Sequence, residues 1–420
     1  MSSNVSRVHR GERWATLIAA GALCLAVGVL VYRGKHDAQS WVLADFKEQV
    51  YYPERAFLEG RNPYGGYPAP NSLAGYAPHT LLIHLPLGLV DYPTAAIAYQ
   101  MLVSLLTVTF AYTVLRFSGS RDGLAATLGL AAAILVSRPG QMNFINGNVT
   151  VQVLLGAYVA FHYARRRPAV AAAGLALSLI KPTIGIPLAI MMLLGRGDVK
   201  AVVLGGVIAA VLSAMAMVVI LPEAGGIGPF VASVRAGVEG FRAVTETDPL
   251  GGWSRVDVIP VVAKLMGRNP PLLTEIALGL AILASGVIGV RRLLARGGSA
   301  DSCLVTTIVY LTILIFSYQQ AYNVLILTLP LAALVVDPDT RPVATRPIAR
   351  WTLVGLLVFP FLNYLSTYGA LTRLGIEGWR WTLVTSLSGL ALLTAWSVTL
   401  GSTVWPSRLP AREVSPLQGA

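Results

Sequence analysis

The chain alternates long apolar stretches with short polar ones from its first span to its last. A helix needs roughly 20 apolar residues to cross ~30 Å of hydrocarbon, and we interpret twelve stretches as membrane spans. They are residues 14–32, 92–115, 123–136, 147–163, 169–180, 183–194, 201–221, 272–293, 304–316, 322–336, 351–368 and 379–400. The pattern predicts an all-α membrane protein, a polytopic bundle of about 12 transmembrane helices in a single domain over residues 1–400.

Basic residues set the predicted orientation. Arg7, Arg10 and Arg13 precede the first span, so the N-terminus is expected in the cytoplasm and the loop 33–75 outside. A cleaved signal peptide is the alternative, but the stretch is long for one and lacks a small-x-small cleavage site. The later basic clusters, and the tail 401–420, fall inside if residues 76–90 dip into the membrane or lie at its surface. If residues 76–90 cross completely, every later loop inverts.

Composition changes this picture little. Of 420 residues, 55% are hydrophobic and 12% charged, whereas an ordinary soluble domain has about 25% charged residues. The net charge of +12 comes from Lys and Arg in short loops beside apolar stretches, which indicates membrane topology and not nucleic-acid binding. Cys24 and Cys303 lie in separate apolar stretches, and the five histidines lack metal-ligand spacing. We therefore expect no metal, no cofactor and no nucleic-acid partner.

An acidic residue stands in the outer loop 33–75, just before a cluster of aromatic, glycine and proline residues. In a chain that is nearly all membrane, chemistry is expected where polar side chains meet the bilayer surface. Asp45 is the first candidate, and Glu48, one helical turn away, is the second. A second large outer loop, residues 222–271, contains an amphipathic stretch over residues 229–244 that predicts a surface helix. We expect its carboxylates to be solvated: Glu239, Glu246, Asp248 and Asp257.

Lys181 interrupts apolar sequence together with Pro182, and the two apolar segments beside it have only about twelve residues each. An ionisable residue at a helix centre costs about 2.5–3.5 kcal/mol on insertion scales, so it usually faces a cavity or a partner. Pro182 frees backbone carbonyls, which is tolerated at membrane depth where the chain lines a cavity. An anion such as a lipid phosphate would suit Lys181. The alternative is that its long side chain only snorkels to the interface.

Two further polar segments share the predicted outer side. Residues 138–148 are polar, interrupted by glycine and without a helical apolar period, which favours a loop; an ordinary solvated turn is the alternative. Residues 317–323 form another outward tip. The Asn148-Val149-Thr150 triplet matches a glycosylation acceptor pattern that is common by chance.

Taken in order, these motifs resemble glycosyltransferase family 87 over about residues 14–330. The resemblance is carried by Asp45-Phe46, Tyr51-Tyr52, Ala56, Gly60, Asn62-Pro63-Tyr64, Tyr76-Ala77-Pro78, Gly140-Gln141, Asn143, Ile180-Lys181-Pro182, Ser317, Tyr322 and Leu325. The chain departs from the family at two points. His79 stands where a second proline is frequent, and the Ser317 tip lacks the histidine or aspartate often found nearby.

The resemblance implies an inverting, metal-independent enzyme of the GT-C type in the plasma membrane, with both termini cytoplasmic. Such an enzyme moves a hexose, mannose foremost, from a polyprenyl-phosphate sugar to a lipid-linked or cell-envelope glycan acceptor on the extracytoplasmic side. Asp45 would be the general base and Lys181 the partner of the leaving phosphate. The remaining predicted substrate-binding residues are Gln141, Asn143, Tyr51, Tyr52, Asn62, Tyr64, Tyr76, His79 and Tyr322.

Other functions stay open at this point. A lipid or sugar transporter or flippase would also have about twelve spans, although a transporter should show repeated halves, which the sequence lacks. A non-catalytic scaffold needs no base. The Asp337-Pro338-Asp339 pair resembles the metal-binding acidic pair of soluble glycosyltransferases, but it follows a predicted span on the cytoplasmic side without a Gly-rich nucleotide-binding unit.

Overall fold

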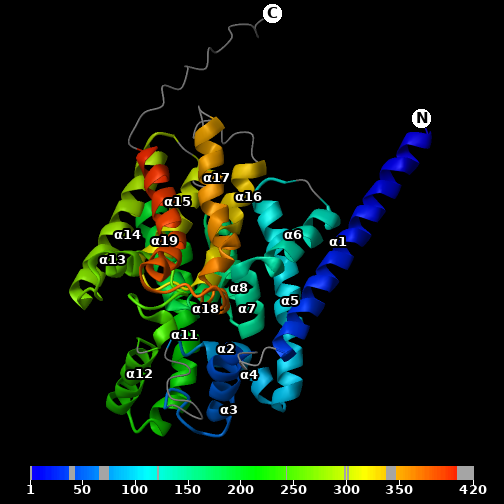
Figure 1. Cartoon of the computed structure of the whole chain (residues 1–420). Helices are drawn as coiled ribbons and strands as arrows, with labels where there is room; N and C mark the ends of the chain where they lie inside the picture. The colour runs from blue at the N-terminus through cyan, green and yellow to red at the C-terminus, as the bar shows by residue number, and fades with distance from the viewer. Residues whose placement is uncertain are drawn as a thin grey trace, which may run out of the picture.

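The computed structural model describes residues 2–36, 43–65, 75–120, 123–242, 244–297, 299, 302–336 and 347–403. Helices are the main regular structure of these residues (Figure 1), and the one extended pairing among them is an isolated antiparallel bridge between Arg255 and Gln320. Residues 66–68 of the predicted aromatic and proline cluster, the 337–339 acidic pair and the tail beyond residue 403 lie outside the described residues.

Five described helices are long and apolar enough to cross a membrane. They are α1 (Ser2–His36), α5 (Tyr92–Phe117), α11 (Val199–Glu223), α14 (Leu272–Ala295) and α19 (Gly378–Gly401). The prediction of an all-α membrane protein is confirmed, whereas twelve transmembrane helices are not. The reason is length, because most of the other predicted spans form helices of about three turns.

These shorter helices lie among the long ones. They are α6 (Leu124–Val136), α8 (Thr150–Tyr163), α9 (Pro168–Ser178), α10 (Pro182–Ile190) continued by η2 (Met191–Arg196), α15 (Cys303–Phe316), η4 (Ala321–Leu327) continued by α16 (Thr328–Val336), and α17 (Pro347–Leu362). Glycines bring some of them into backbone contact. A Cβ added to Gly156 of α8 would lie 2.6 Å from the carbonyl oxygen of Gly174 in α9, the close packing that small residues allow between membrane helices.

Residues 138–146, which we expected to be a loop, form the helix α7 (Arg138–Asn146). The Ser137 side chain accepts a hydrogen bond from the Gly140 backbone N–H, Pro139 stands in the first turn, and Gly147 in the left-handed conformation ends the helix. These are start and stop signals of a helix, and they override the missing apolar period. The chain bends by 118° between α7 and α8. The number of candidate spans would rise to six if this bent pair crosses the membrane as one span.

A smaller group of helices lies at one end of the bundle, at the bottom of Figure 1. It consists of α2 (Ala44–Phe46), η1 (Lys47–Tyr51), α3 (Tyr52–Leu58), α4 (Thr80–Gly88) and α12 (Ile227–Arg242). α12 confirms the helix expected over residues 229–244. α4 has nine residues and rises about 14 Å, whereas a helix that crosses the hydrocarbon must rise ~30 Å.

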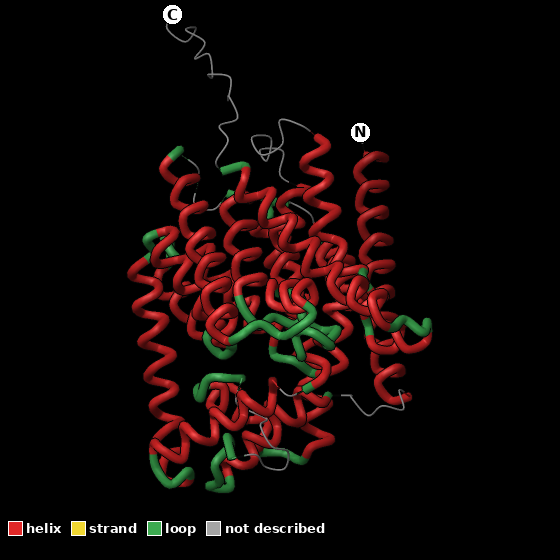
Figure 2. Tube along the Cα trace, turned by 60° about the vertical axis from the view of Figure 1, so that its left-hand side comes forward, coloured by secondary structure: helices red, strands yellow, loops and turns green. Residues whose placement is uncertain are grey.

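Many of the loops form a band between this lower group and the tall bundle (Figure 2). The segment predicted as the second outer loop, residues 222–271, contains η3 (Thr245–Thr247) and α13 (Val258–Met266), and the chain after α17 contains η6 (Tyr364–Ser366) and α18 (Tyr368–Arg373). The loops that this fold brings together carry the candidate site.

Candidate active site

Asp45 is placed by a close contact between α2 and the end of α7. The Leu43 backbone N–H donates to the Ile145 carbonyl over 2.7 Å. Leu43 has φ 57°, the one positive φ at a non-glycine residue in the described chain, and such strain often accompanies functional sites. Gly147 (φ 69°) permits the contact, because an added Cβ would lie 2.7 Å from the Cβ of Phe46 and 2.8 Å from Cδ2 of Leu43.

Two side-chain amides hold the Asp45 carboxylate. Oδ1 accepts a hydrogen bond from Nε2 of Gln49 over 3.1 Å, and Oδ2 accepts one from Nδ2 of Asn148 over 2.8 Å. Burial raises the pKa of Asp45 above its ordinary value, while the Asn148 hydrogen bond and the Lys181 charge act in the opposite direction. A carboxyl group poised in this way suits a general base.

Lys181 precedes α10 and is buried, with 7% of the residue exposed. Its Nζ donates to Oδ1 of Asn323 (3.0 Å), Oγ1 of Thr150 (3.2 Å) and Oδ1 of Asn148 (3.5 Å). The Tyr322 ring centroid lies 4.3 Å from the same atom. This burial contradicts snorkelling, and Asn148 links Lys181 to Asp45 through the two ends of one amide.

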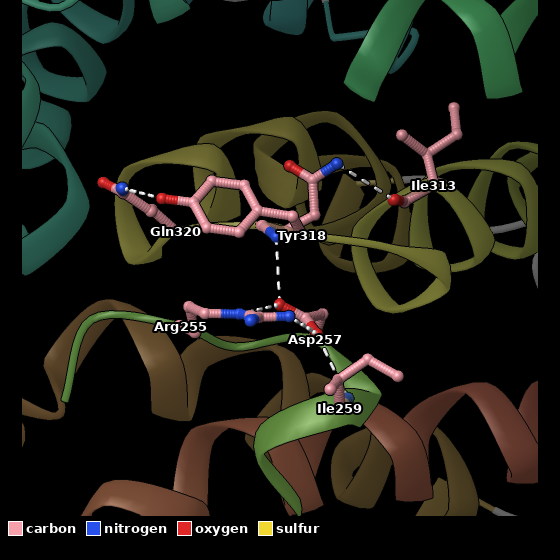
Figure 3. Close-up of polar contacts among 7 residues, drawn as sticks. Arg255, Asp257, Ile259, Ile313, Tyr318 and Gln320 are labelled. Atoms are coloured by element: carbon pink, nitrogen blue, oxygen red, sulfur yellow. Dashed lines mark hydrogen bonds and ion pairs between the residues drawn. The ribbon is translucent and has the colours of Figure 1, made fainter. Parts of the chain in front are cut away.

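A buried ion pair links the second outer loop to the residues around Lys181. Nη2 and Nε of Arg255 lie 2.8 and 2.9 Å from the two carboxylate oxygens of Asp257, and the guanidinium lies under the Tyr318 ring (Figure 3). Asp257 Oδ2 also accepts from the Gln319 backbone N–H (3.0 Å), and Oε1 of Gln319 accepts from Nδ2 of Asn323 (2.6 Å). We expected Asp257 to be solvated. It is 0% exposed, because the 317–323 tip packs over it.

Glu246, also expected to be solvated, is half-buried in η3. Burial raises the pKa of its carboxyl group, and the charge of Asp45 raises it further. Arg138, which is 2% exposed and donates to the carbonyls of Trp253 (3.3 Å) and Ser366 (3.2 Å), opposes this shift. A second carboxyl group therefore lies within electrostatic reach of Asp45.

Several residues predicted from the sequence support this network. Tyr322 and Tyr76 contact it directly, since Oη of Tyr76 accepts from Nδ2 of Asn148 over 3.4 Å. Tyr64 donates through Oη to the Tyr76 carbonyl over 3.0 Å. Asn62 accepts from the Tyr64 backbone N–H with Oδ1, and its Nδ2 reaches Oγ of Ser233 in α12 over 3.5 Å.

Other predicted residues make hydrogen bonds and ring contacts elsewhere. Tyr51 donates through Oη to the Val90 carbonyl (3.1 Å), and the Tyr52 ring lies 5.6 Å from the Lys47 ammonium. His79 is buried between Oγ of Ser213 (3.1 Å) and the Ala176 carbonyl (3.0 Å). These contacts hold helices together, and substrate binding by the three side chains stays a prediction.

Gln141 and Asn143 both lie on α7. Oε1 of Gln141 accepts from Nη1 of Arg33 over 3.0 Å. Gln141 also lines an apolar groove of about 470 Å³ between α1 and α6. Asn143 is 2% exposed, and its Oδ1 has no hydrogen-bond partner among the described residues.

The sequence reasoning missed Asn148, Thr150 and Asn323 as site residues, and it expected Glu246 to be solvated. Asn148 and Thr150 were discounted as a chance glycosylation pattern, yet both are buried beside Lys181. Their signal was the position of polar residues at the start of an apolar stretch, where an unpaired polar group is costly. Within the described residues, no group of three or more His, Cys, Asp and Glu side chains could hold a metal ion.

Long apolar helices with a partly buried carboxylate at one end define a membrane protein with a candidate acid–base site. The sequence model of glycosyltransferase family 87 matches residues 75–318, more than half of the chain. The chain therefore belongs to glycosyltransferase family 87 and is a membrane glycosyltransferase. The matched region includes Asn148, Lys181 and the second outer loop, whereas Asp45 precedes it. Comparison with curated proteins and with solved structures gave no match.

Proposed function

We propose that this glycosyltransferase moves a hexose, mannose in the first instance, from a polyprenyl-phosphate sugar to a lipid-linked or cell-envelope glycan acceptor. The reaction takes place on the extracytoplasmic face of the plasma membrane and inverts the anomeric carbon. The observation that carries the proposal is the Asp45 carboxylate, held by two amides and joined through Asn148 to the buried Lys181 ammonium.

Asp45 acts as the base in this reaction. The acceptor hydroxyl oxygen bonds to the anomeric carbon, the bond from that carbon to the phosphate oxygen breaks, and Asp45 takes the hydroxyl proton. The polyprenyl phosphate leaves with the bonding electron pair. Gln49 and Asn148 each occupy one acceptor direction on the carboxylate. The remaining lone pairs are free to accept the proton.

Lys181 compensates the charge on the leaving phosphate. Its three ammonium hydrogens meet three neutral side-chain oxygens, so a phosphate oxygen has to replace one of them. Such an exchange is favourable because a charged acceptor forms the stronger hydrogen bond. Lys181 therefore binds the phosphate only when it releases one of these three hydrogen bonds.

The groove beside Gln141 supports a lipid donor. Its wall is formed by small and aliphatic side chains of α1 and α6, and part of α1 is a candidate membrane span. If this part of α1 spans the membrane, the groove faces hydrocarbon, and its apolar wall suits a prenyl chain.

Asp45→Asn tests the proposal, because it keeps the size of the side chain and removes its basicity. With radiolabelled polyprenyl-phosphate mannose and an envelope lipid extract, the full-length variant should lose ~10²- to 10⁴-fold in turnover. Glu239→Gln is the matched control, since Glu239 is 65% exposed in a surface pair with Arg235. Near-wild-type turnover by Asp45→Asn would remove Asp45 as the base. If the enzyme prefers polyprenyl-phosphate glucose to polyprenyl-phosphate mannose as donor, only the proposed identity of the sugar would change.

A further inference from the structure

The backbone of Asn148 is fixed from three directions. Its N–H donates to the Asn143 carbonyl over 3.0 Å, which closes the end of α7. Gly147 turns the chain with φ 69° and lets Phe46 and Leu43 pack directly against this turn. α8 begins two residues later at Thr150. These contacts fix Asn148 in the turn between α7 and α8, where it packs against the segment that carries Asp45.

The orientation of its amide is fixed as well. Oδ1 accepts hydrogen bonds from the Thr150 backbone N–H (3.0 Å) and from Oγ1 of Thr150 (2.5 Å), and it faces Nζ of Lys181 (3.5 Å). A backbone N–H can only donate, so this end of the amide must be the oxygen. The other end, Nδ2, then points at Oδ2 of Asp45 over 2.8 Å.

We propose that Asn148 is a positioning residue that holds the Asp45 carboxylate in its proton-accepting orientation and couples it to the Lys181 ammonium. The inference rests on the proposed function, in which Asp45 is the base. The Lys181 ammonium polarises the amide from its oxygen end, which strengthens the hydrogen bond donated at the nitrogen end. Lys181 thus acts on Asp45 without touching it.

The coupling predicts a change in protonation with a definite sign. An amide hydrogen stabilises the ionised carboxylate, so its removal raises the pKa of Asp45 further above the ordinary value. The proton-accepting form is then reached only at higher pH. The other charged or titratable groups that act electrostatically with Asp45 are Glu48, Lys181, Glu246, Tyr76, Tyr99 and Tyr322.

The decisive variants are Asn148→Leu, which keeps the approximate size and removes both ends of the amide, and Asn148→Asp. The latter keeps the acceptor toward Thr150 and replaces the donor with a second carboxylate beside Asp45. With radiolabelled polyprenyl-phosphate mannose we expect kcat at neutral pH to fall about ten- to a hundredfold for Asn148→Leu and further for Asn148→Asp. The acid limb of kcat/KM should move to higher pH in Asn148→Leu.

Asn363→Leu is the control. Asn363 is 5% exposed and donates to Oγ of Ser388 over 2.9 Å, so it reports the general cost of losing a buried asparagine. Its pH profile should match that of the wild type. An Asn148→Leu enzyme with the wild-type profile, or one that loses the same factor at every pH, would overturn the coupling.

A second measurement does not depend on the donor. The infrared band of the protonated Asp45 carboxyl is identified by its absence from Asp45→Asn, and it should titrate at higher pH in Asn148→Leu than in the wild type. An unshifted band overturns the coupling even if Asp45 proves to be the base. A shifted band together with an active Asp45→Asn enzyme overturns the proposed function and leaves the coupling intact.

Discussion

A buried charged side chain costs free energy unless neighbouring groups compensate it, and this protein meets that cost in different ways. Asp257 has a charged partner in Arg255, whereas Lys181 is surrounded by neutral oxygens and a ring face. Glu54 in α3 has neither. It is 0% exposed, its two carboxyl oxygens have no hydrogen-bond partner among the described residues, and burial raises its pKa to about 10. Glu54 is therefore protonated at neutral pH.

Glu54→Gln should make stability less dependent on pH. The folded-state pKa of about 10 lies above the ordinary value of 4.5, so the contribution of Glu54 is fully present below about pH 4.5 and is lost as pH rises toward 10. The melting temperature of the wild type in detergent should fall across this window more steeply than that of Glu54→Gln. Glu59→Gln, which changes an exposed carboxylate, serves as control. Equal slopes for Glu54→Gln and the wild type would show that Glu54 is ionised in the folded protein.

Lys181→Met should weaken donor binding about ten- to a hundredfold, because the aliphatic side chain remains while the charge-assisted contact with phosphate disappears. Binding of a polyprenyl phosphate to the detergent-solubilised protein gives the affinity, and Lys181→Arg should retain part of it. Lys264→Met is a matched control, since Lys264 is buried and donates to the Gly252 carbonyl and Oγ1 of Thr385. If Lys181→Met binds as tightly as the wild type, another cation holds the phosphate, and Arg138 is the next to test.

Among the structural elements, the loops determine where the residues of the candidate site lie. The apolar stretches of the sequence located the helices, because hydrophobic runs of this kind have few alternatives in a membrane. The α7 helix differs from the predicted loop, because its capping residues define a helix despite the missing apolar period. Lys181 could be found because a charge in apolar sequence is conspicuous. The pairing of Asn148 with Asp45 could not be found, because the two residues lie 103 positions apart in the sequence and only the fold brings them together.

Arg255 and Asp257 anchor the second outer loop to the 317–323 tip, and removing one partner leaves a buried charge unpaired. Arg255→Met should therefore destabilise the protein by about 3–5 kcal/mol, measured by chemical unfolding in detergent. Adding Asp257→Asn to Arg255→Met should restore part of this loss. Arg235→Met, which breaks the exposed pair with Glu239, should cost about 0.2–1 kcal/mol. A double variant that is less stable than Arg255→Met would show that Asp257 acts mainly through its backbone hydrogen bonds.

The whole molecule is asymmetric along the bundle. The start of α1 and the end of α19 lie at one end of it, while α3, α4 and α12 lie at the other (Figure 1). Asp45 belongs to the segment that leads into α3. If the positively charged N-terminal segment faces the cytoplasm, the helices around Asp45 face outside. This is the side on which a polyprenyl-phosphate donor is proposed to bind.

Single cysteines test this orientation in a background without Cys24 and Cys303. Glu59 precedes α4, Asn146 ends α7, and Arg166 follows α8. If α4, which has nine residues, does not cross, and if α5 and α6 lead in and back out, Glu59→Cys and Asn146→Cys should both react with an impermeant thiol reagent in intact cells. Arg166→Cys, at an exposed position, should react only after the cytoplasmic face is opened. Labelling of Glu59→Cys without Asn146→Cys would mean that residues 76–90 cross completely. Labelling of Arg166→Cys alone would place Asp45 and Lys181 in the cytoplasm and rule out an extracytoplasmic reaction.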